Sequence, residues 1–158
     1  MFRRHPRWAR GVITEADLDA IASAVRETER GTLAEIRVHL ERRVAHGLRR
    51  RTTDPMERAR QVFGALGMHR TSHRSGVLVY LAVEDRKLAI VGDDGIHARV
   101  GDEYWSGVRD RMIERLRAGA LRAAVVGAVA EVGATLARFF PRRPDDVDEL
   151  SDDVSLGR

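Results

Sequence analysis

The chain has 158 residues, enough for a single folded domain with short tails, and its 43% hydrophobic and 33% charged residues are typical of a soluble globular protein. It contains no cysteine, which excludes disulfides, thiolate zinc sites and cysteine nucleophiles and is compatible with a cytoplasmic location. The formal net charge is +4, and because Lys87 is the only lysine, arginine carries almost all of the positive charge, a preference that genome base composition explains as well as nucleic-acid binding does.

The first twelve residues are predicted to be a basic arm. Residues 1–12 contain four arginines and no acidic residue, with Phe2 just before the first arginine and Trp8 between the last two. Such an arm can contact RNA or a membrane surface, and the alternative is a solvated end without structure. Because few apolar residues are available to order the arm, we expect residues 1–12 to be disordered.

A helix and then a strand are predicted after the arm. Thr14 stands at an N-cap position with Asp17 three residues later, a capping-box pattern, and apolar residues follow at helical spacing until Gly31. Within residues 33–41, the side chains from Ala34 onward alternate strictly between apolar and polar. This alternation predicts a strand near the sheet edge, with one face in the core and the other in water. The water-facing side chains are those of Glu35, Arg37, His39 and Glu41.

The middle of the chain is predicted to form a helix and a β-hairpin. Asp54 as N-cap and Pro55 at the first helical position start the helix. Residues 76–83 are a near-continuous apolar run, which indicates a strand buried on both faces. Residues 84–87 then form a short turn into a second strand over residues 88–92, so the two strands are expected to be antiparallel.

Two helices complete the predicted domain. Asp102 is expected to cap the first, whose apolar stripe consists of Trp105, Val108, Met112 and Leu116. The second covers residues 120–140, and its charged residues indicate a core helix rather than a membrane span. The folded domain is therefore expected to cover residues 13–141. Residues 142–158 are rich in Asp and Glu and are expected to form an acidic disordered tail.

The order of these elements predicts which polar residues come together. Strand–helix–strand connections are right-handed and parallel, so the first two strands run in the same direction and the hairpin sends the third strand back. The loop after the third strand carries Asp93 and Asp94 between two glycines, at the end of the sheet where Glu35 lies. The opposite end is expected to hold Glu84, Asp85 and Asp54.

The paired carboxylates have two interpretations. Ca²⁺ and Mg²⁺ take several oxygen ligands, so we predict a cation site formed by Asp93, Asp94 and Glu35. Secondary candidates are Asp85, Glu84 and Asp54. Alternatively, Asp93 and Asp94 close a turn by accepting hydrogen bonds from backbone amides. The loop is not an EF-hand, because Tyr104 stands where that motif requires Glu. No nucleophile–base motif is legible, so no catalytic residue is predicted.

Four stretches occur in this order along the chain: "AEIRVHLERR", "DPMERARQVFGALGM", "GVLVYLAVEDRKLAIVGDDGI" and the closing helices through "RFFP". Together they resemble the TPM domain family, named for a thylakoid lumen phosphatase, a photosystem II repair protein and a modulator of a nematode receptor. The resemblance covers roughly residues 13–141 and implies a three-layer α/β/α sandwich around a small mixed β-sheet. It matches Glu35 to an acidic position in the first strand, Asp85 and Arg86 to the hairpin turn, and Asp93 to the loop after the third strand.

The resemblance also implies several functions, namely acid phosphatase activity, divalent-cation binding, and roles in assembling or repairing membrane complexes. Many relatives carry a signal peptide and a C-terminal membrane helix. We expect this protein to lack both and to represent the shorter soluble branch of the family, in the cytoplasm. Longer relatives tend to have a glycine-rich loop where this chain has "GDDGI".

We therefore expect a divalent-cation-binding or adaptor module that takes Ca²⁺ or Mg²⁺. Its partner is expected to be an unknown protein, for example in a membrane complex, and the protein itself a monomer or a weak dimer. One alternative is a weak metal-assisted acid phosphatase. The other is an RNA- or membrane-surface-binding protein that works through the N-terminal arginine arm, although the small number of arginines does not favour nucleic acid.

Overall fold

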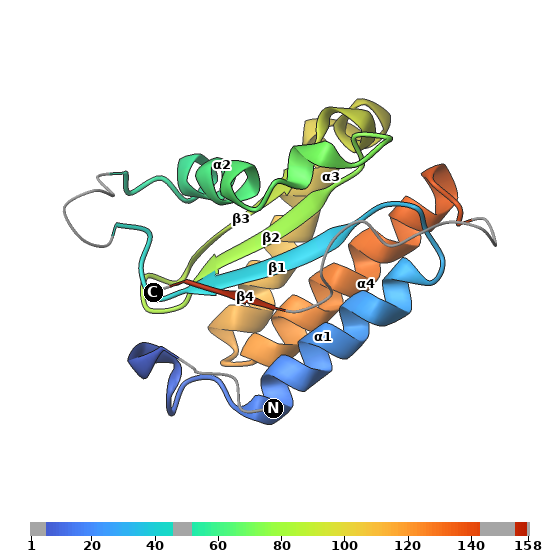
Figure 1. Ribbon diagram of the computed structural model, residues 1–158. Coiled ribbons are helices and arrows are strands. Elements are labelled where there is room, and N and C mark those ends of the chain that lie inside the picture. Colours follow the sequence, from blue (N-terminus) through green and yellow to red (C-terminus); the bar gives the residue numbers. More distant parts are fainter. Residues whose placement is uncertain (1–5, 46–51, 143–153, 158) are drawn as a thin grey trace.

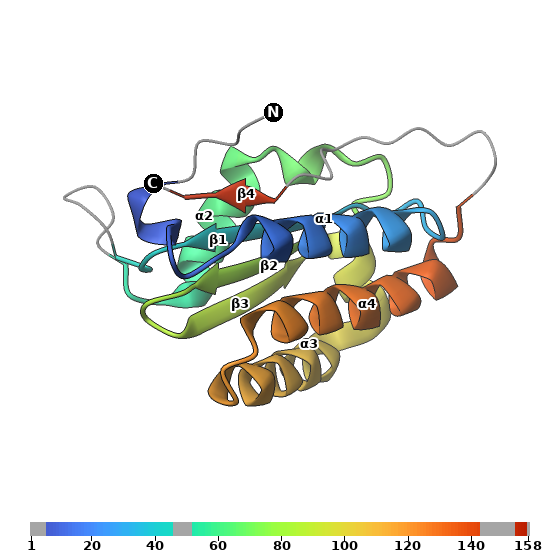
Figure 2. The same ribbon diagram turned by 90° about the horizontal axis from the view of Figure 1, so that it is seen from below.

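The computed structural model describes residues 6–45, 52–142 and 154–157. Within these residues a four-stranded mixed sheet, in the order β3-β2-β1-β4, lies between two layers of helices (Figure 1, Figure 2). Its strands are β1 (Ile36–Glu41), β2 (Val77–Ala82), β3 (Lys87–Gly92) and β4 (Ser155–Leu156). Helix α2 (Pro55–Ala65) covers one face, whereas α1 (Glu15–Glu29), α3 (Asp94–Arg117) and α4 (Leu121–Phe139) cover the other. This arrangement confirms the predicted α/β/α sandwich around a small mixed sheet.

The strand directions are those predicted from the order of elements. β1 and β2 are parallel, with Ile36 beside Val77, and β2 and β3 are antiparallel, with Val77 beside Gly92. The start of β1, the start of β2 and the end of β3 therefore lie at the same end of the sheet. The hairpin turn and the exit of β1 lie at the other end, where Val83 N donates a hydrogen bond to Glu41 O.

The helix starts follow the predicted caps. Thr14 Oγ1 accepts a hydrogen bond from the Asp17 amide, and Asp17 Oδ2 accepts one from the Thr14 amide, each at 3.0 Å. This reciprocal pair satisfies two of the amides that the first turn of α1 leaves free. At α2, Asp54 Oδ1 accepts from the Met56 amide at 3.0 Å, and Pro55 occupies the first turn.

The sheet separates two apolar cores. One lies under α2, and the larger one lies under α1, α3 and α4. Each fully buried aliphatic side chain contributes about 1.5–3 kcal/mol to stability relative to an exposed one. The buried residues of β2 alternate between the cores: Leu78, Tyr80 and Ala82 pack with α2, and Val77, Val79 and Leu81 pack with the other helices. β2 is therefore buried on both faces, as its apolar run predicts.

The polar face of β1 is not in water, contrary to the prediction from its alternation. Glu35, His39 and Glu41 are buried. Helix α2 lies over this face, and β4 pairs with β1, so β1 is not the outermost strand of the described sheet. Alternation shows which side chains share a face, but it does not show what covers that face.

The segment after β3 also differs from the prediction of an open loop that ends at a cap by Asp102. Asp93 is the N-cap of α3, and residues 94–100 are helical. Gly101 interrupts the helix with φ 77° and ψ 176°, and a second helical segment follows it. Glycine adopts this backbone conformation without the steric penalty that a side chain imposes. The apolar stripe predicted for the helical segment after Gly101 is present, and its residues Trp105, Val108 and Met112 are buried.

Helix α4 packs against α1 and α3, as its small side chains allow. Arg122 near its start donates a hydrogen bond to Asp17 Oδ1 at 2.7 Å, which ties α4 to the first turn of α1. Among the described residues, none of the helices combines the length and apolarity that crossing a bilayer requires.

The described parts of both termini pack on the domain, so the expectation of two disordered tails is wrong for them. Residues 7–9 form the short helix η1 (Arg7–Ala9), in which Ala9 is buried. Near the other terminus, β4 runs parallel to β1, with Ser155 beside His39. The remainder of the expected arm and tail, residues 1–5, 143–153 and 158, lies outside the described residues. Apolar side chains at Trp8 and Val154 supply the contacts that order these segments.

Candidate functional site

A cavity of about 560 Å³ opens where β3 ends, between α2 and the first half of α3. Its large apolar lining residues include Phe63, Ile90 and Trp105. Its charged lining residues and its histidine are Arg60, Asp93, Asp94, His97, Asp102 and Arg109. Convergent polar groups around an apolar hollow are typical of a ligand site. The cavity is therefore the candidate functional site, and it contains the Asp93–Asp94 pair that the sequence indicates.

Asp93 is held in place by backbone hydrogen bonds on both of its sides. Its amide donates to Gly76 O at 2.9 Å, and its carbonyl accepts from the His97 amide at 2.9 Å. Its side-chain Oδ1 accepts from the Asp94 amide at 2.8 Å. Oδ2 is buried and has no hydrogen-bond partner within residues 6–45, 52–142 and 154–157. Asp93 thus caps the helix with one carboxylate oxygen, whereas the other has no hydrogen-bond partner among the described residues.

His97 is oriented by its neighbours on α3. Its Nδ1 accepts a hydrogen bond from Trp105 Nε1 at 3.1 Å, and its Nε2 lies 3.6 Å from Asp102 Oδ1. An indole N–H only donates, so the proton of a neutral His97 ring is on Nε2, which points toward Asp102. Nδ1 is therefore engaged by Trp105, whereas Nε2 faces Asp102 at a distance longer than a hydrogen bond.

Glu35 lies at the same end of the sheet as Asp93, as predicted. Its carbonyl accepts from the Val77 amide at 2.8 Å, next to Gly76, whose carbonyl accepts from Asp93. However, Glu35 is buried and is not among the residues that line the cavity. In the part of the chain that the structure describes, no group of three or more His, Asp or Glu side chains is placed to hold a metal ion. The structure therefore brings Asp93 and Asp94 together at the cavity but does not add Glu35 to them.

The secondary candidates lie at the opposite end of the sheet, as expected, and each has a structural contact. Glu84 forms ion pairs with Arg42 at 2.7 Å and with Arg43 at 2.9 Å. The hydrogen bond from Arg42 is the main cause that lowers the pKa of the Glu84 carboxyl. Asp85 Oδ2 accepts from the Val44 amide at 2.8 Å, and Asp54 caps α2. These three carboxylates stabilise turns and a helix start.

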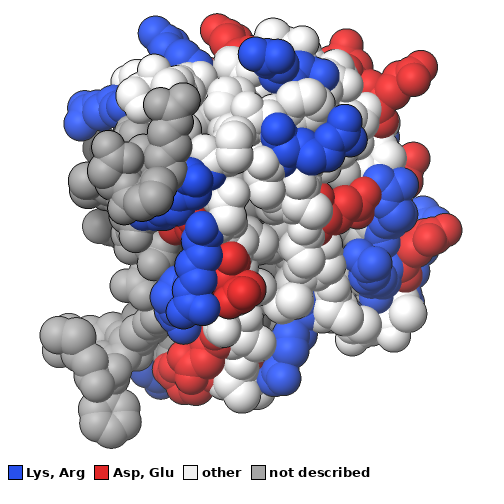
Figure 3. All heavy atoms as spheres, turned by 90° about the vertical axis from the view of Figure 1, so that its right-hand side faces the viewer, with Lys and Arg blue, Asp and Glu red and all other residues white. Residues whose placement is uncertain are grey.

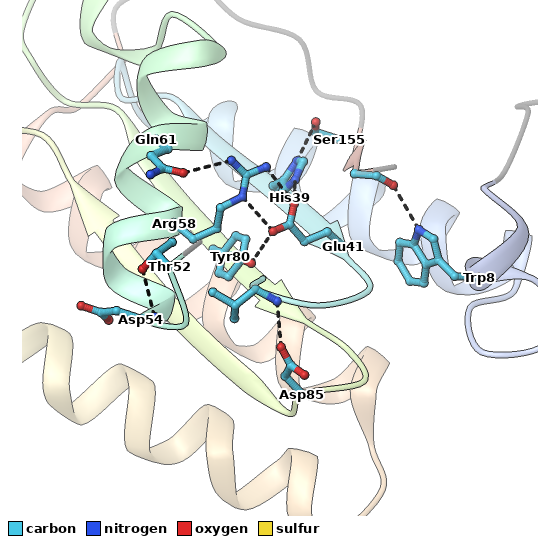
Figure 4. Close-up of polar contacts among 12 residues, drawn as sticks. Trp8, His39, Glu41, Thr52, Asp54, Arg58, Gln61, Tyr80, Asp85 and Ser155 are labelled. Atoms are coloured by element: carbon cyan, nitrogen blue, oxygen red, sulfur yellow. Dashed lines mark hydrogen bonds and ion pairs between the residues drawn. The ribbon is translucent and has the colours of Figure 1, made fainter. Parts of the chain in front are cut away.

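A buried polar cluster lies between β1 and α2 (Figure 4) and was not predicted from the sequence. Glu41 is 0% exposed, and Arg58 binds both of its oxygens, with Nε at 2.9 Å from Oε2 and Nη2 at 3.1 Å from Oε1. Tyr80 Oη donates to Oε2 at 2.5 Å, and His39 Nε2 lies 3.1 Å from Oε1. The carboxylate thus has a partner on every side.

The environment of Glu41 keeps it ionised. Burial alone would raise the pKa of the Glu41 carboxyl, but the hydrogen bonds from His39, Arg58 and Tyr80 and the charge of Arg58 outweigh burial and hold the pKa far below its usual range. The only hint in the sequence was that His39 and Glu41 share a face of an otherwise apolar strand. Their partners stand on other elements, so sequence spacing alone could not identify the cluster.

The comparisons with known proteins agree with this fold. A model of the TPM domain family matches residues 8–135. The solved structure of BA42 protein from the psychrophilic bacterium Bizionia argentinensis is 36% identical, with a TM-score of 0.79 over 91% of this chain and 94% of that chain. Comparison with curated proteins gives no match.

Two further solved structures share the fold at lower identity. The N-terminal domain of a protein from P. gingivalis is 16% identical, with a TM-score of 0.65 over 84% of each chain. The N-terminal domain of cg2496 protein from Corynebacterium glutamicum is 15% identical, with a TM-score of 0.60 over 94% of each chain. Because the family match covers most of the sequence and the BA42 likeness covers nearly all of it, the chain belongs to the TPM domain family.

Proposed function

We propose that the protein is a non-enzymatic binding module that takes a divalent cation, Ca²⁺ or Mg²⁺, at Asp93 and Asp94. The observation that carries the proposal is the Asp93 side chain, whose buried Oδ2 has no hydrogen-bond partner among the described residues and belongs to a cavity-lining residue. A buried polar atom without a partner lowers stability by about 1–3 kcal/mol, more when it is charged. A cation that seeks oxygen ligands relieves this cost.

The two carboxylates offer fewer oxygen ligands than a cation needs, so a bound cation would keep several of its waters. Mg²⁺ usually keeps several waters and binds through one or two carboxylates, whereas Ca²⁺ takes six to eight oxygen ligands. Asp93 and the exposed Asp94 offer two carboxylates. The free amides at the start of α3 carry partial positive charge, which opposes a cation at the same place. We therefore expect weak binding, with a Kd in the millimolar range.

The arrangement of the cavity supports binding over catalysis. Ser106 lines the cavity and is a possible nucleophile by residue type. A serine nucleophile needs a base within hydrogen-bond reach, but His97 accepts from Trp105 and directs its other nitrogen toward Asp102. A weak metal-assisted phosphatase is therefore the less supported alternative.

As an adaptor, the protein would contact a protein partner, for example one in a membrane complex, and act in the cytoplasm as a monomer or a weak dimer. One face of the described surface (Figure 3) argues against a nucleic acid as the partner. On the face shown in Figure 3, acidic and basic side chains are interspersed. Binding to nucleic acid relies on basic side chains clustered on one face, so this face does not favour that alternative.

A titration followed by NMR tests the cation site. Adding MgCl₂ or CaCl₂ to the ¹⁵N-labelled protein should shift the amide signals of Asp93, Asp94 and the first turn of α3, and the shifts should follow a saturation curve with a midpoint in the millimolar range. The Asp93→Asn variant should lose these shifts. Asp19→Asn, the same change of charge at an exposed position on α1, should keep them. Shifts that are absent, or that persist in Asp93→Asn, would overturn the proposal.

A further inference from the structure

The outer edge of β1 is a second place where the structure suggests binding, at a distance from the cation site. β4 pairs with β1 only beside His39 and Leu40, toward the end of β1 that is opposite to Asp93. Within the described residues, no strand pairs with the outer side of Ile36 to Val38. Among the described residues, the C-terminal segment 154–157 therefore covers one half of this edge, and no described strand pairs with the other half.

Every residue of segment 154–157 makes a specific contact. Val154 is buried in the larger core, and Leu156 packs against the same core. Ser155 Oγ lies 2.9 Å from His39 Nδ1. The backbone of Gly157 donates to Leu40 O at 2.8 Å and accepts from Trp8 Nε1 at 3.1 Å. These are the contacts of a bound peptide, with backbone hydrogen bonds for affinity and side-chain contacts for selectivity.

The surface under the segment is rigid and selects glycine at its last position. A Cβ on Gly157 would lie 2.5 Å from Glu41 Cβ and 2.8 Å from Oε1. Glu41 cannot move aside easily, because Arg58, Tyr80 and His39 all hold its carboxylate (Figure 4). Any larger residue at this position would therefore push the segment off the edge.

Arg37 indicates what the open half of the edge would accept. It shares the polar face of β1 with His39, two residues away. Its Nε is buried and has no hydrogen-bond partner in the described part of the chain. A strand that continues the β4 register toward the start of β1 would place the residue two positions before its serine beside Arg37. An acidic residue at that position would pair with the guanidinium.

We propose that the outer edge of β1 is a binding groove for an extended segment of a partner protein, with the order acidic–apolar–Ser–apolar–Gly, and that segment 154–157 occupies this groove as an intramolecular competitor. Because β4 pairs with β1 over only two residues, a partner strand can displace segment 154–157 from this edge. A partner strand that also pairs along Ile36 to Val38 gains backbone hydrogen bonds that the two-residue pairing of β4 lacks. This groove is independent of the proposed cation site, which lies at the other end of the sheet.

The test uses the full chain and a fluorescein-labelled peptide with the sequence of residues 152–158, DDVSLGR. In the wild type the attached segment competes with the peptide at a high effective concentration. Gly157→Val should release that segment, because the added side chain meets Glu41. The variant should therefore bind the peptide at least about tenfold more tightly than the wild type does, as measured by fluorescence anisotropy. Gly64→Val, where an added side chain meets open space on α2, is the matched control and should bind like the wild type. A peptide with Val in place of its Gly should not bind, and Arg37→Gln should weaken binding in the Gly157→Val chain.

A second variant keeps the test decisive. Leu156→Asp should also release the segment, because it places a charge against the core, and the indole N–H signal of Trp8 reports the release in both variants. The proposal is overturned if neither variant binds the peptide, or if both bind a scrambled peptide equally well. A wild-type dimer that dissociates when the peptide is added would assign the groove to a second copy of this chain, and would also overturn the proposal of a different partner.

Discussion

Trp8 and Gly157 are joined by a hydrogen bond although 149 positions separate them in the chain, with the indole Nε1 at 3.1 Å from the carbonyl oxygen. The bond ties η1 to the segment that follows β4, beside the buried pair of His39 and Glu41 (Figure 4). The two ends of the described chain thereby meet at one corner of the sheet, where the groove proposed above is located.

The Trp8–Gly157 bond predicts a modest but specific loss of stability. Trp8→Phe keeps most of the apolar packing and removes the donor, so the free energy of unfolding should fall by roughly 0.5–1.5 kcal/mol. Urea denaturation measures this change. The matched variant Trp8→Ala should lose more, because it also removes the packing of Trp8 against the core. Equal stability of Trp8→Phe and the wild type would show that the bond contributes nothing.

The cation site predicts a melting temperature that depends on metal. At free Mg²⁺ or Ca²⁺ 100-fold above Kd, the folded state gains about 2.7 kcal/mol, which corresponds to a rise of roughly 5–10 °C for a chain of this size. Asp93→Asn should abolish the rise and cost little without metal, because Asn also serves as an N-cap. Asp19→Asn and Glu35→Gln should retain the rise. A wild-type melting curve that neither cation shifts at a concentration 100-fold above the Kd found by NMR would leave Asp93 as a helix cap alone.

The buried ion pair of Arg58 and Glu41 predicts a large effect from one substitution and a small one from its neighbour. Arg58→Met leaves the Glu41 carboxylate buried without its main cation, so the loss of stability should be about 3–5 kcal/mol. Arg60→Met, on the same helix at an exposed position, should change stability by less than about 0.5 kcal/mol. Guanidinium chloride denaturation compares the two. Similar small values for both would show that Glu41 does not depend on Arg58 for its burial as a carboxylate.

The lowered pKa of Glu41 predicts how stability depends on acid. The folded protein holds this carboxyl ionised while the unfolded chain titrates it near 4.5, so the unfolded state binds more protons as the pH falls. The stabilisation from Glu41 is therefore complete above pH 4.5 and is lost as the pH falls below that value toward the lowered pKa.

Glu41→Gln isolates this contribution. Its free energy of unfolding should fall less steeply with acid than that of the wild type between pH 4.5 and the acid limit of folding. The carboxyls of Asp17 and Glu84, whose pKa values are also lowered, are present in both proteins and cancel in the comparison. Parallel curves for the two proteins would contradict the assignment.

The proposed absence of catalysis predicts negligible turnover of phosphate esters. At saturating Mg²⁺, hydrolysis of p-nitrophenyl phosphate should remain far below the roughly 10 s⁻¹ that is the median for enzymes. Turnover near that rate which Asp93→Asn or Ser106→Ala abolishes would instead favour the metal-assisted phosphatase.

Local sequence patterns determined most of the architecture. The capping box of Thr14 and Asp17, the start of α2 at Asp54 and Pro55, and the hairpin of β2 and β3 each depend on residues only a few positions apart. The parallel pairing of β1 and β2 followed from the handedness of strand–helix–strand connections. These features are encoded locally, because caps, turns and side-chain periodicity are properties of neighbouring residues.

Only the tertiary structure decided which polar residues are buried and which of them meet. Glu41 was predicted to face water, yet its partners Arg58 and Tyr80 stand 17 and 39 positions away and enclose it. Glu35 and Asp93 lie at the same end of the sheet, but only Asp93 lines the cavity. Trp8 looked like part of a disordered arm because its partner is at the other end of the chain. Burial and pairing depend on which other elements pack against a given face. A pattern of nearby residues carries no information about those elements, because they come from distant parts of the chain.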